Sequence, residues 1–288
     1  MSNLKQISKA GVIVVIVFLV FIFMVVIPLL NQMKFIARNT ICSWNLGGIG
    51  NSLNAYAFGY RDEYPVQGAG THVWGTTTTG WNNPKKNWKQ STGTMTVASS
   101  LFLLIRENDI GVKSFMCVSS DQQPFVNDTD FDNVELWDFG SNPTDHLSYS
   151  YQFPYGKFPA GGTSNPSVAI MADRNPWFDK KLTPSAIENE RRGTFADKVS
   201  LIDIFKDARN WKTRIGNSQP HGRRGQNVLF NDGHVSFVKR CDVGKFDDNI
   251  YTIGGQTQEE KRRGIAPVSD VIDAVDEFDS LLVNDRSR

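Results

Sequence analysis

Three cysteines, Cys42, Cys117 and Cys241, are the side chains of this chain with the most distinctive chemistry. None of them belongs to a Cys-x-x-Cys pair, which argues against a zinc site or a dithiol redox centre. In a domain outside the cytoplasm, one pair of thiols can oxidise to a disulfide. We favour Cys42 and Cys117 as that pair, and the alternative is three unpaired thiols.

The four histidines are the next candidates, because metal hydrolases use histidine ligands together with a bound water. They are His72, His146, His221 and His234, and the last two flank Asp232. No pair has the His-x-x-x-His spacing of a metal-binding helix. We therefore expect a structural role for His221, bonded into the neighbouring hairpin, and keep an anchored metal hydrolase only as a weaker alternative. No nucleophile elbow, Walker loop or dinucleotide-binding glycine motif is present, and this favours a protein that is not an enzyme.

Two acidic loop regions raise the question of structural calcium, which binds carboxylates and carbonyls of irregular loops. Neither region has the spacing of an EF-hand. We expect solvated acidic loops without a cofactor, with calcium as the alternative. The aspartates concerned are Asp121, Asp128, Asp130 and Asp132 in the first region, and Asp242, Asp247 and Asp248 in the second.

Trp74, Trp81 and Trp88 recur at intervals of seven in a stretch rich in Gly, Thr and Asn. Exposed rings at this spacing can form a platform for a polysaccharide or a protein partner. The other interpretation, which we prefer, is that they cover the core beneath long loops.

The element that positions all of these groups begins at the N-terminus. Residues 10–33 contain no charge, and the sixteen residues Val12–Ile27 are all Val, Ile, Leu, Phe or Met. As a helix this stretch is long enough to cross a bilayer, and it is longer than the apolar core of a cleaved signal peptide. Pro28 should kink this helix near its far end. Charges flanking the span are nearly balanced, with a slight preference for a cytoplasmic N-terminus.

The helix should continue beyond the membrane as an amphipathic segment over residues 34–60. Its apolar side chains are spaced three and four apart, which is one helical face. They are Leu46, Ile49, Leu53, Tyr56 and Tyr60. We thus divide the chain into a cytoplasmic tail (1–9), a transmembrane helix (10–33), this continuation, a globular domain (61–254) and a C-terminal tail (255–288).

The globular domain should be of the α+β class. A helix is predicted over 96–107, strands over 149–153 and 168–172, and a tight hairpin over 227–238 whose Asp232-Gly233 turn needs a positive φ. The tail fits either a helix over its acidic stretch or an extended strand at 281–283. The net charge of +1 gives no indication of a nucleic-acid partner.

In this order, the features resemble the bacterial prepilin-like family named for its His-x(9)-Asp-Gly motif, often labelled type II secretion protein G-like. The resemblance covers most of the chain. The segments that carry it are Arg38-Asn-Thr-Ile-Cys-Ser-Trp-Asn-Leu-Gly-Gly-Ile-Gly-Asn-Ser-Leu53, Ser99-Ser-Leu-Phe-Leu-Leu-Ile-Arg106, Lys113-Ser-Phe-Met-Cys-Val-Ser-Ser120, Met171-Ala-Asp-Arg-Asn-Pro176, His221-Gly-Arg-Arg-Gly-Gln-Asn-Val-Leu-Phe-Asn-Asp-Gly-His-Val235 and Asp279-Ser-Leu-Leu-Val283.

The resemblance implies a pilin-like fold, in which the N-terminal helix packs on an antiparallel sheet, and export of the C-terminal domain. It also matches Cys42 and Cys117 to the two cysteines of the family, supports the extended tail, and makes His221, Asp232 and Gly233 the family motif. Two departures stand out. Ten residues, not nine, separate His221 from Asp232, and no glutamate stands at the fifth position after Gly11, the possible cleavage site.

The resulting hypothesis is a pseudopilin-like, single-pass protein of the cytoplasmic membrane with its domain in the periplasm or outside the cell. Its expected partners are the lipid bilayer and other pilin-like subunits or secretion-system proteins, without nucleic acid. The missing glutamate is consistent with a permanent anchor. A surface module that binds glycans through Trp74, Trp81 and Trp88 is the alternative function.

Overall fold

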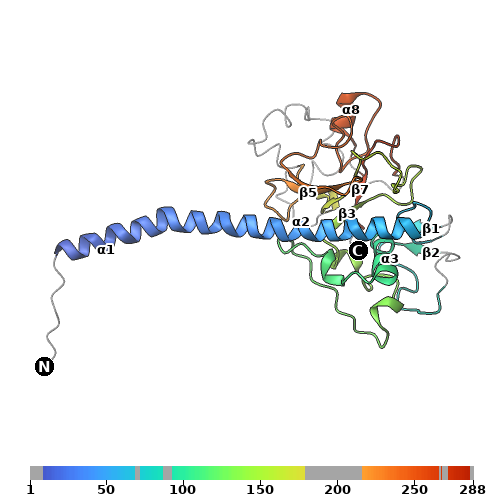
Figure 1. Ribbon diagram of the computed structural model, residues 1–288, viewed down its shortest axis with the longest axis horizontal. Coiled ribbons are helices and arrows are strands. Elements are labelled where there is room, and N and C mark those ends of the chain that lie inside the picture. Colours follow the sequence, from blue (N-terminus) through green and yellow to red (C-terminus); the bar gives the residue numbers. More distant parts are fainter. Residues whose placement is uncertain are drawn as a thin grey trace.

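The computed structural model describes residues 9–68, 72–86, 93–178, 216–265, 267 and 272–285. One long helix projects from a globular part, and its N-terminal half is free of that part (Figure 1). The chain is therefore of the predicted α+β class, with a long N-terminal helix and an antiparallel sheet.

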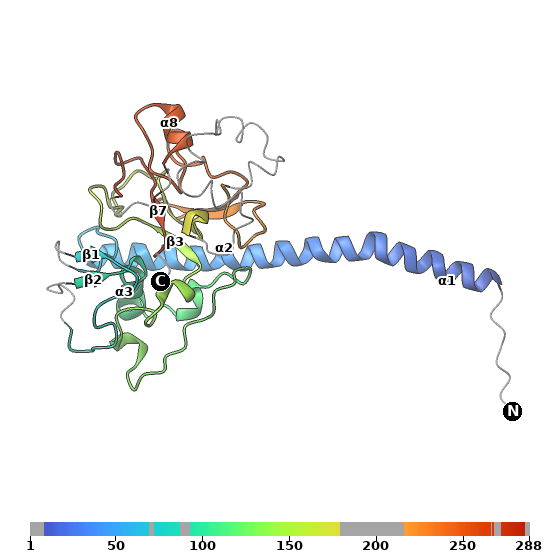
Figure 2. The same cartoon turned by 180° about the vertical axis from the view of Figure 1, so that it is seen from behind.

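The long helix consists of α1 (Lys9–Phe21), a π-helical turn (Ile22–Val26) and α2 (Ile27–Gly59). Pro28 lacks an amide hydrogen, and its ring would clash with the carbonyl four residues earlier. The π turn ends two residues before Pro28 and is the local adjustment that such a site requires. Figures 1 and 2 show that the helix changes direction there but continues, which agrees with the kink expected from the sequence.

The main sheet has five antiparallel strands in the order β6-β5-β4-β3-β7. A short parallel pair, β1 and β2, precedes α3 (Val97–Asn108). In both views the five-stranded sheet lies on one side of α2, and α3 lies on the other side (Figures 1 and 2). The strand bounds are β1 His72–Trp74, β2 Gly93–Met95, β3 Tyr149–Gln152, β4 Ala169–Asp173, β5 Gln226–Phe230, β6 Val235–Val238 and β7 Leu282–Val283.

Short helices complete the fold. Thr96 caps the N-terminus of α3, since its hydroxyl accepts from the Ser99 amide. The helix ends at Asn108, and Asp109 after it takes the left-handed conformation. The mixed-charge segment near residue 260 forms α8 (Gln258–Arg263). The 3₁₀ turns are η2 Val112–Phe115, η3 Asn133–Glu135, η4 Pro143–Asp145 and η5 Pro176–Phe178.

The core is divided by the sheet. On one face, Leu46, Ile49 and Leu53 of α2 pack with α3 and with Leu229 of β5. The opposite face carries a second cluster that includes Val228 and Phe230. Successive residues of β5 therefore face opposite sides of the sheet, and the extended form of the tail is confirmed because β7 pairs with β3.

Candidate functional site

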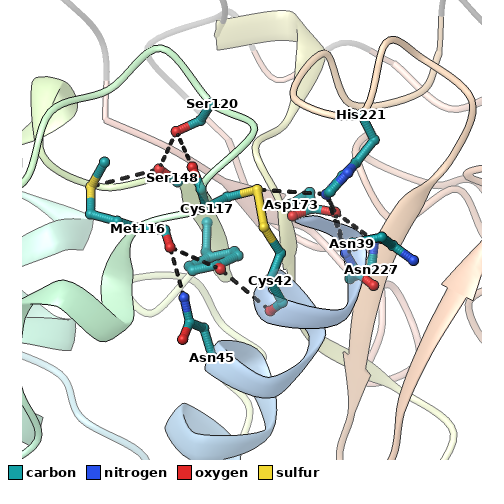
Figure 3. Close-up of a disulfide and its surroundings, with 11 residues drawn as sticks. Asn39, Cys42, Asn45, Met116, Cys117, Ser120, Ser148, Asp173, His221 and Asn227 are labelled. Atoms are coloured by element: carbon teal, nitrogen blue, oxygen red, sulfur yellow. Dashed lines mark hydrogen bonds and ion pairs between the residues drawn. A yellow bond between two sulfur atoms is a disulfide. The ribbon is translucent and has the colours of Figure 1, made fainter. Parts of the chain in front are cut away.

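Cys42 of α2 and Cys117, just after η2, form a disulfide with a Cα–Cα distance of 5.0 Å (Figure 3). Both residues are buried, and the bond closes a sequence separation of 75 residues. Asn45, one helical turn after Cys42, donates to the carbonyl of Met116 at 2.8 Å, so a hydrogen bond fixes the same two segments. The predicted pairing is confirmed, and Cys241 is a buried free thiol.

His221 lies against this disulfide with a side chain that is fully buried (Figure 3). Its Nε2 atom is 3.2 Å from Oδ2 of Asp173 and 3.6 Å from Sγ of Cys117. Nδ2 of Asn227 donates to the same Asp173 oxygen at 3.1 Å and to Oδ1 of Asn39 at 2.9 Å. An Nε2–H tautomer of His221 therefore completes a network that joins α2, the loop before β5, the end of β4 and the start of β5.

The three motif residues, His221, Asp232 and Gly233, lie in two separate places. His221 is at the disulfide, where its Nε2 atom and Nδ2 of Asn227 in β5 both face Oδ2 of Asp173. Asp232 instead lies exposed in the hairpin turn, where it accepts from the His234 amide at 3.0 Å, and this bond lowers its pKa. Gly233 has φ +87°, which explains the glycine in a three-residue turn. The motif is thus a pair of structural features at the two ends of β5.

Cys42, Cys117 and His221 are the group of described residues that comes close enough to hold a metal ion, with candidate ligand atoms within 4.8 Å of one another. Zinc sites use thiolates, whereas these two sulfur atoms are bonded to each other. A catalytic metal also needs an open coordination position, and all three side chains are buried. The disulfide and His221 together connect α2, the segment after η2 and the loop before β5.

The two acidic loops differ: Asp128, Asp130 and Asp132 of the first are exposed, as expected, whereas Asp242 and Asp248 of the second are buried, so the prediction of a solvated loop is wrong there. Asp132 caps η3. Asp242 pairs with Arg240 and Arg262, and Asp247 also pairs with Arg262. Asp132, Asp242 and Asp247 therefore face arginines or backbone amides in the structure.

The tryptophans contribute to packing. Trp74 donates to Oδ1 of Asp285 at 2.8 Å, and its ring lies 5.2 Å from that of Phe153. Trp81 is half-buried against the core. This placement agrees with the core-covering interpretation for both residues, and Trp88 lies outside the described residues.

A buried carboxylate pair at the start of α3 was not anticipated from the sequence. Asp285 accepts from the amides of Val97 and Ala98 at 2.6 and 2.8 Å, and Asp138 accepts from the hydroxyls of Thr78 and Thr96. Burial, followed by the charge of Asp285, raises the pKa of Asp138 to about 7, and burial raises that of Asp285 to about 6. The one signal in the sequence is that Asp285 lies two residues after the apolar stretch Leu281-Leu-Val283.

The long helix has two exposed surfaces. In its N-terminal part, a helix long and apolar enough to cross a membrane, large apolar side chains from Val12 to Met33 are exposed. In the domain, the face of α2 opposite the core carries Ile41, Trp44 and Phe58, of which Phe58 is 94% exposed.

No known family model, curated protein or solved structure matches this chain.

Proposed function

We propose that this protein is a non-enzymatic, membrane-anchored structural subunit of the pilin or pseudopilin type, with its globular domain outside the cytoplasmic membrane. The apolar helix supports the anchor, because hydrocarbon is the solvent that suits its exposed side chains. The buried Cys42–Cys117 disulfide supports an oxidising compartment for the domain. A pilus-like or type II secretion apparatus is the assembly in which such a subunit would serve.

The observation that carries the proposal is the outer face of α2. No charged residue occurs between Arg38 and Arg61, although the helix has a core-facing side and an exposed side. An exposed helical face in water normally carries charged residues. The exposed residues here, spaced three and four apart, are Ile41, Trp44, Gly48, Asn51, Ala55 and Phe58.

This face suits another helix of the same kind. A side-chain carbon added at Gly48 would have no neighbour within 4 Å, so a second helix can approach the backbone there. Trp44 and Phe58, 75% and 94% exposed, would bury large apolar areas in such a contact. Because the same helix continues into the membrane, side-by-side packing of several copies would join their anchors and their domains together.

Cross-linking in native membranes tests the assembly. Ala55→Cys places one accessible thiol on the outer face, since Cys241 is buried, and a bifunctional thiol reagent should yield covalent dimers. Asp128→Cys, on an exposed loop away from α2, is the matched control. Cross-linking of Ala55→Cys no greater than that of Asp128→Cys would rule out subunit packing through this face.

The mass of the intact protein from native membranes tests processing. Gly11 lies within α1, in an unbroken helix. A mass for the uncut chain would indicate a permanent anchor, whereas a mass that begins after Gly11 would indicate prepilin-type cleavage before assembly.

A further inference from the structure

A pocket of about 520 Å³ lies where the anchor helix meets the domain. It is lined by Pro28, Asn31, Gln32, Phe35 and Ile36 of α2 and by Arg224 of the globular part, and we call it the junction pocket. Its volume is within the range of small-molecule sites, and its lining combines apolar side chains, two amides and a guanidinium group.

The depth of the junction pocket follows from the helix. Asn31 is the first polar side chain after Lys9. A hydrocarbon layer of about 30 Å takes roughly twenty helical residues at about 1.5 Å each, which places its far boundary near Leu30. The next turn of the helix, which contains Asn31 and Phe35, therefore lies at the level of the lipid headgroups.

Arg224 is held in place over this turn. Its guanidinium carbon lies 4.9 Å from the centre of the Phe35 ring, a cation–π contact. Phe35 in turn packs edge-on against His221 and Phe237, at 6.2 and 5.9 Å between ring centres. The next residue, Gly225, has φ +155°, and a side-chain carbon there would be 2.3 Å from the Val238 carbonyl oxygen. His221, which contacts the disulfide, thus supports the Phe35 ring on which the guanidinium group of Arg224 lies.

The charge of Arg224 is not matched within the described protein. Its side chain is exposed, and the ion pairs of the described residues do not include it. Lys34 and Arg38 on the same stretch of helix add positive charge at this level. A guanidinium fork with amide donors beside it is a chemistry that recognises phosphate, and the apolar residues below it suit acyl chains.

We propose that the junction pocket binds the headgroup of one anionic phospholipid, with Arg224 on the phosphate and Asn31 and Gln32 as further donors. The bound lipid would fix the height and the rotation of the domain on the bilayer. This inference rests on the membrane anchor of the proposed function, but not on assembly through the outer face of α2.

Native mass spectrometry of the full chain in detergent, with added dihexanoyl-phosphatidylglycerol, tests the site. We expect one lipid bound to the wild type, and an affinity loss of about fivefold to tenfold in Arg224→Gln, on the scale of one interfacial arginine. Arg224→Lys, which keeps the charge and loses the fork, should lie in between. Lys113→Gln removes the same charge from an exposed site elsewhere and should bind like the wild type.

Several results would overturn this assignment. Equal binding by the wild type and Arg224→Gln would show that the pocket is not the site. Binding of inorganic phosphate, or of dihexanoyl-phosphatidylcholine, as tightly as the anionic lipid would show that an anionic phospholipid is not the ligand. Extraction of native membranes with alkaline carbonate distinguishes failure of the proposed anchor from failure of the proposed lipid site. Release of the protein would contradict the membrane anchor. Retention, together with equal binding by the wild type and Arg224→Gln, would contradict only the lipid site.

Discussion

The two halves of the long helix differ in environment, although both lack acidic residues. We call residues 9–33 the anchor half and residues 34–59 the domain half. The half that contains α1 is apolar all around and has no buried residue, whereas α2 buries Cys42, Leu46, Ile49 and Leu53. Both halves are continuous in one helix. The anchor half has no apolar partner among the described residues, and we propose that lipid is that partner, whereas the domain half packs in the domain core.

The difference teaches that low charge alone does not distinguish an anchor from a core helix. In the anchor half, large apolar residues occupy every side of the helix, so no single face is marked for packing against the domain. In the domain half, large apolar residues recur every three or four positions, and small or amide residues separate them. Spacing and residue size, rather than mean hydropathy, therefore predict which half enters the domain.

Removal of the disulfide should give the largest effect, and it should act on the domain half alone. For a separation of 75 residues, Cys42→Ala with Cys117→Ala should lower the free energy of unfolding by about 4 kcal/mol, because the unfolded chain gains freedom. Denaturant titration of the full chain in detergent, followed by tryptophan fluorescence, measures this change. Retention in membranes after a carbonate wash should not change.

Cys241→Ala is the control for this first prediction, since it removes a buried thiol without a cross-link. We expect it to cost about 1 kcal/mol, in the ordinary range of single core substitutions. A double variant as stable as Cys241→Ala would show that the disulfide does not hold α2 to the domain.

A matched pair of leucines sets the two halves directly against each other. Leu46 is fully buried in the core, so Leu46→Ala should lower the free energy of unfolding by about 3 kcal/mol. Leu30 is 49% exposed outside the domain, and Leu30→Ala should leave domain unfolding unchanged within about 0.5 kcal/mol. Similar losses in the two variants, measured by the same titration, would contradict the division of the helix.

Much of the fold could be predicted because its signals are local. Leu46, Ile49 and Leu53 mark one helical face, Asp232-Gly233 marks a turn, and alternating residues of 227–238 mark two faces of a hairpin. The cysteine positions favour the Cys42–Cys117 pairing, and the family resemblance supports it. Each of these predictions depends on residues close in sequence or on the resemblance to a family with the same order of segments.

The remainder depends on contacts between distant segments. Asp173, at the end of β4, meets His221 only because β4 and β5 are neighbours, and no local pattern indicates that pair. Asp285 caps α3 across a sequence separation of 188 residues from Val97. His221 and Asp232 belong to one sequence motif, but they lie beyond opposite ends of β5. Such sites follow from the order of the strands in the sheet, which local sequence patterns do not reveal.

Acidity offers a third comparison, because the anchor half has no titratable side chain between Lys9 and Lys34 and all pH dependence should arise in the domain. The pKa of Asp138 is raised to about 7 in the folded protein, so the folded state binds more protons than the unfolded state between about pH 4 and 7. The contribution of Asp138 to stability should therefore fall as the pH rises through this window, by up to about 1.4 kcal/mol per unit.

Unfolding titrations at several pH values, for the wild type and Asp138→Asn, measure this slope. The variant loses the ionisation, so its stability should fall less steeply between pH 4 and 7, whatever its absolute stability. Glu135→Gln changes a neighbouring exposed acid and should keep the wild-type slope. An Asp138→Asn slope equal to that of the wild type would show that this carboxyl does not titrate as its burial predicts.

Two glycines of α2, one on each face of the helix, should give the smallest effects, and only the substitution on the outer face should stabilise the domain. At Gly48, on the outer face, an added side-chain carbon meets nothing within 4 Å, so Gly48→Ala should stabilise the domain by about 1 kcal/mol through helix propensity. At Gly50, on the core face, the same carbon would lie 2.9 Å from a methyl group of Leu229. Overpacking there costs about 1–3 kcal/mol, which cancels or exceeds the gain in propensity. Gly50→Ala should therefore be less stable than Gly48→Ala by about 1–3 kcal/mol in the same titration.

Equal stabilities of the two variants would mean that α2 does not approach β5 as closely as the structure shows. A loss of stability in Gly48→Ala that occurs only in native membranes would indicate that another molecule already packs against the outer face.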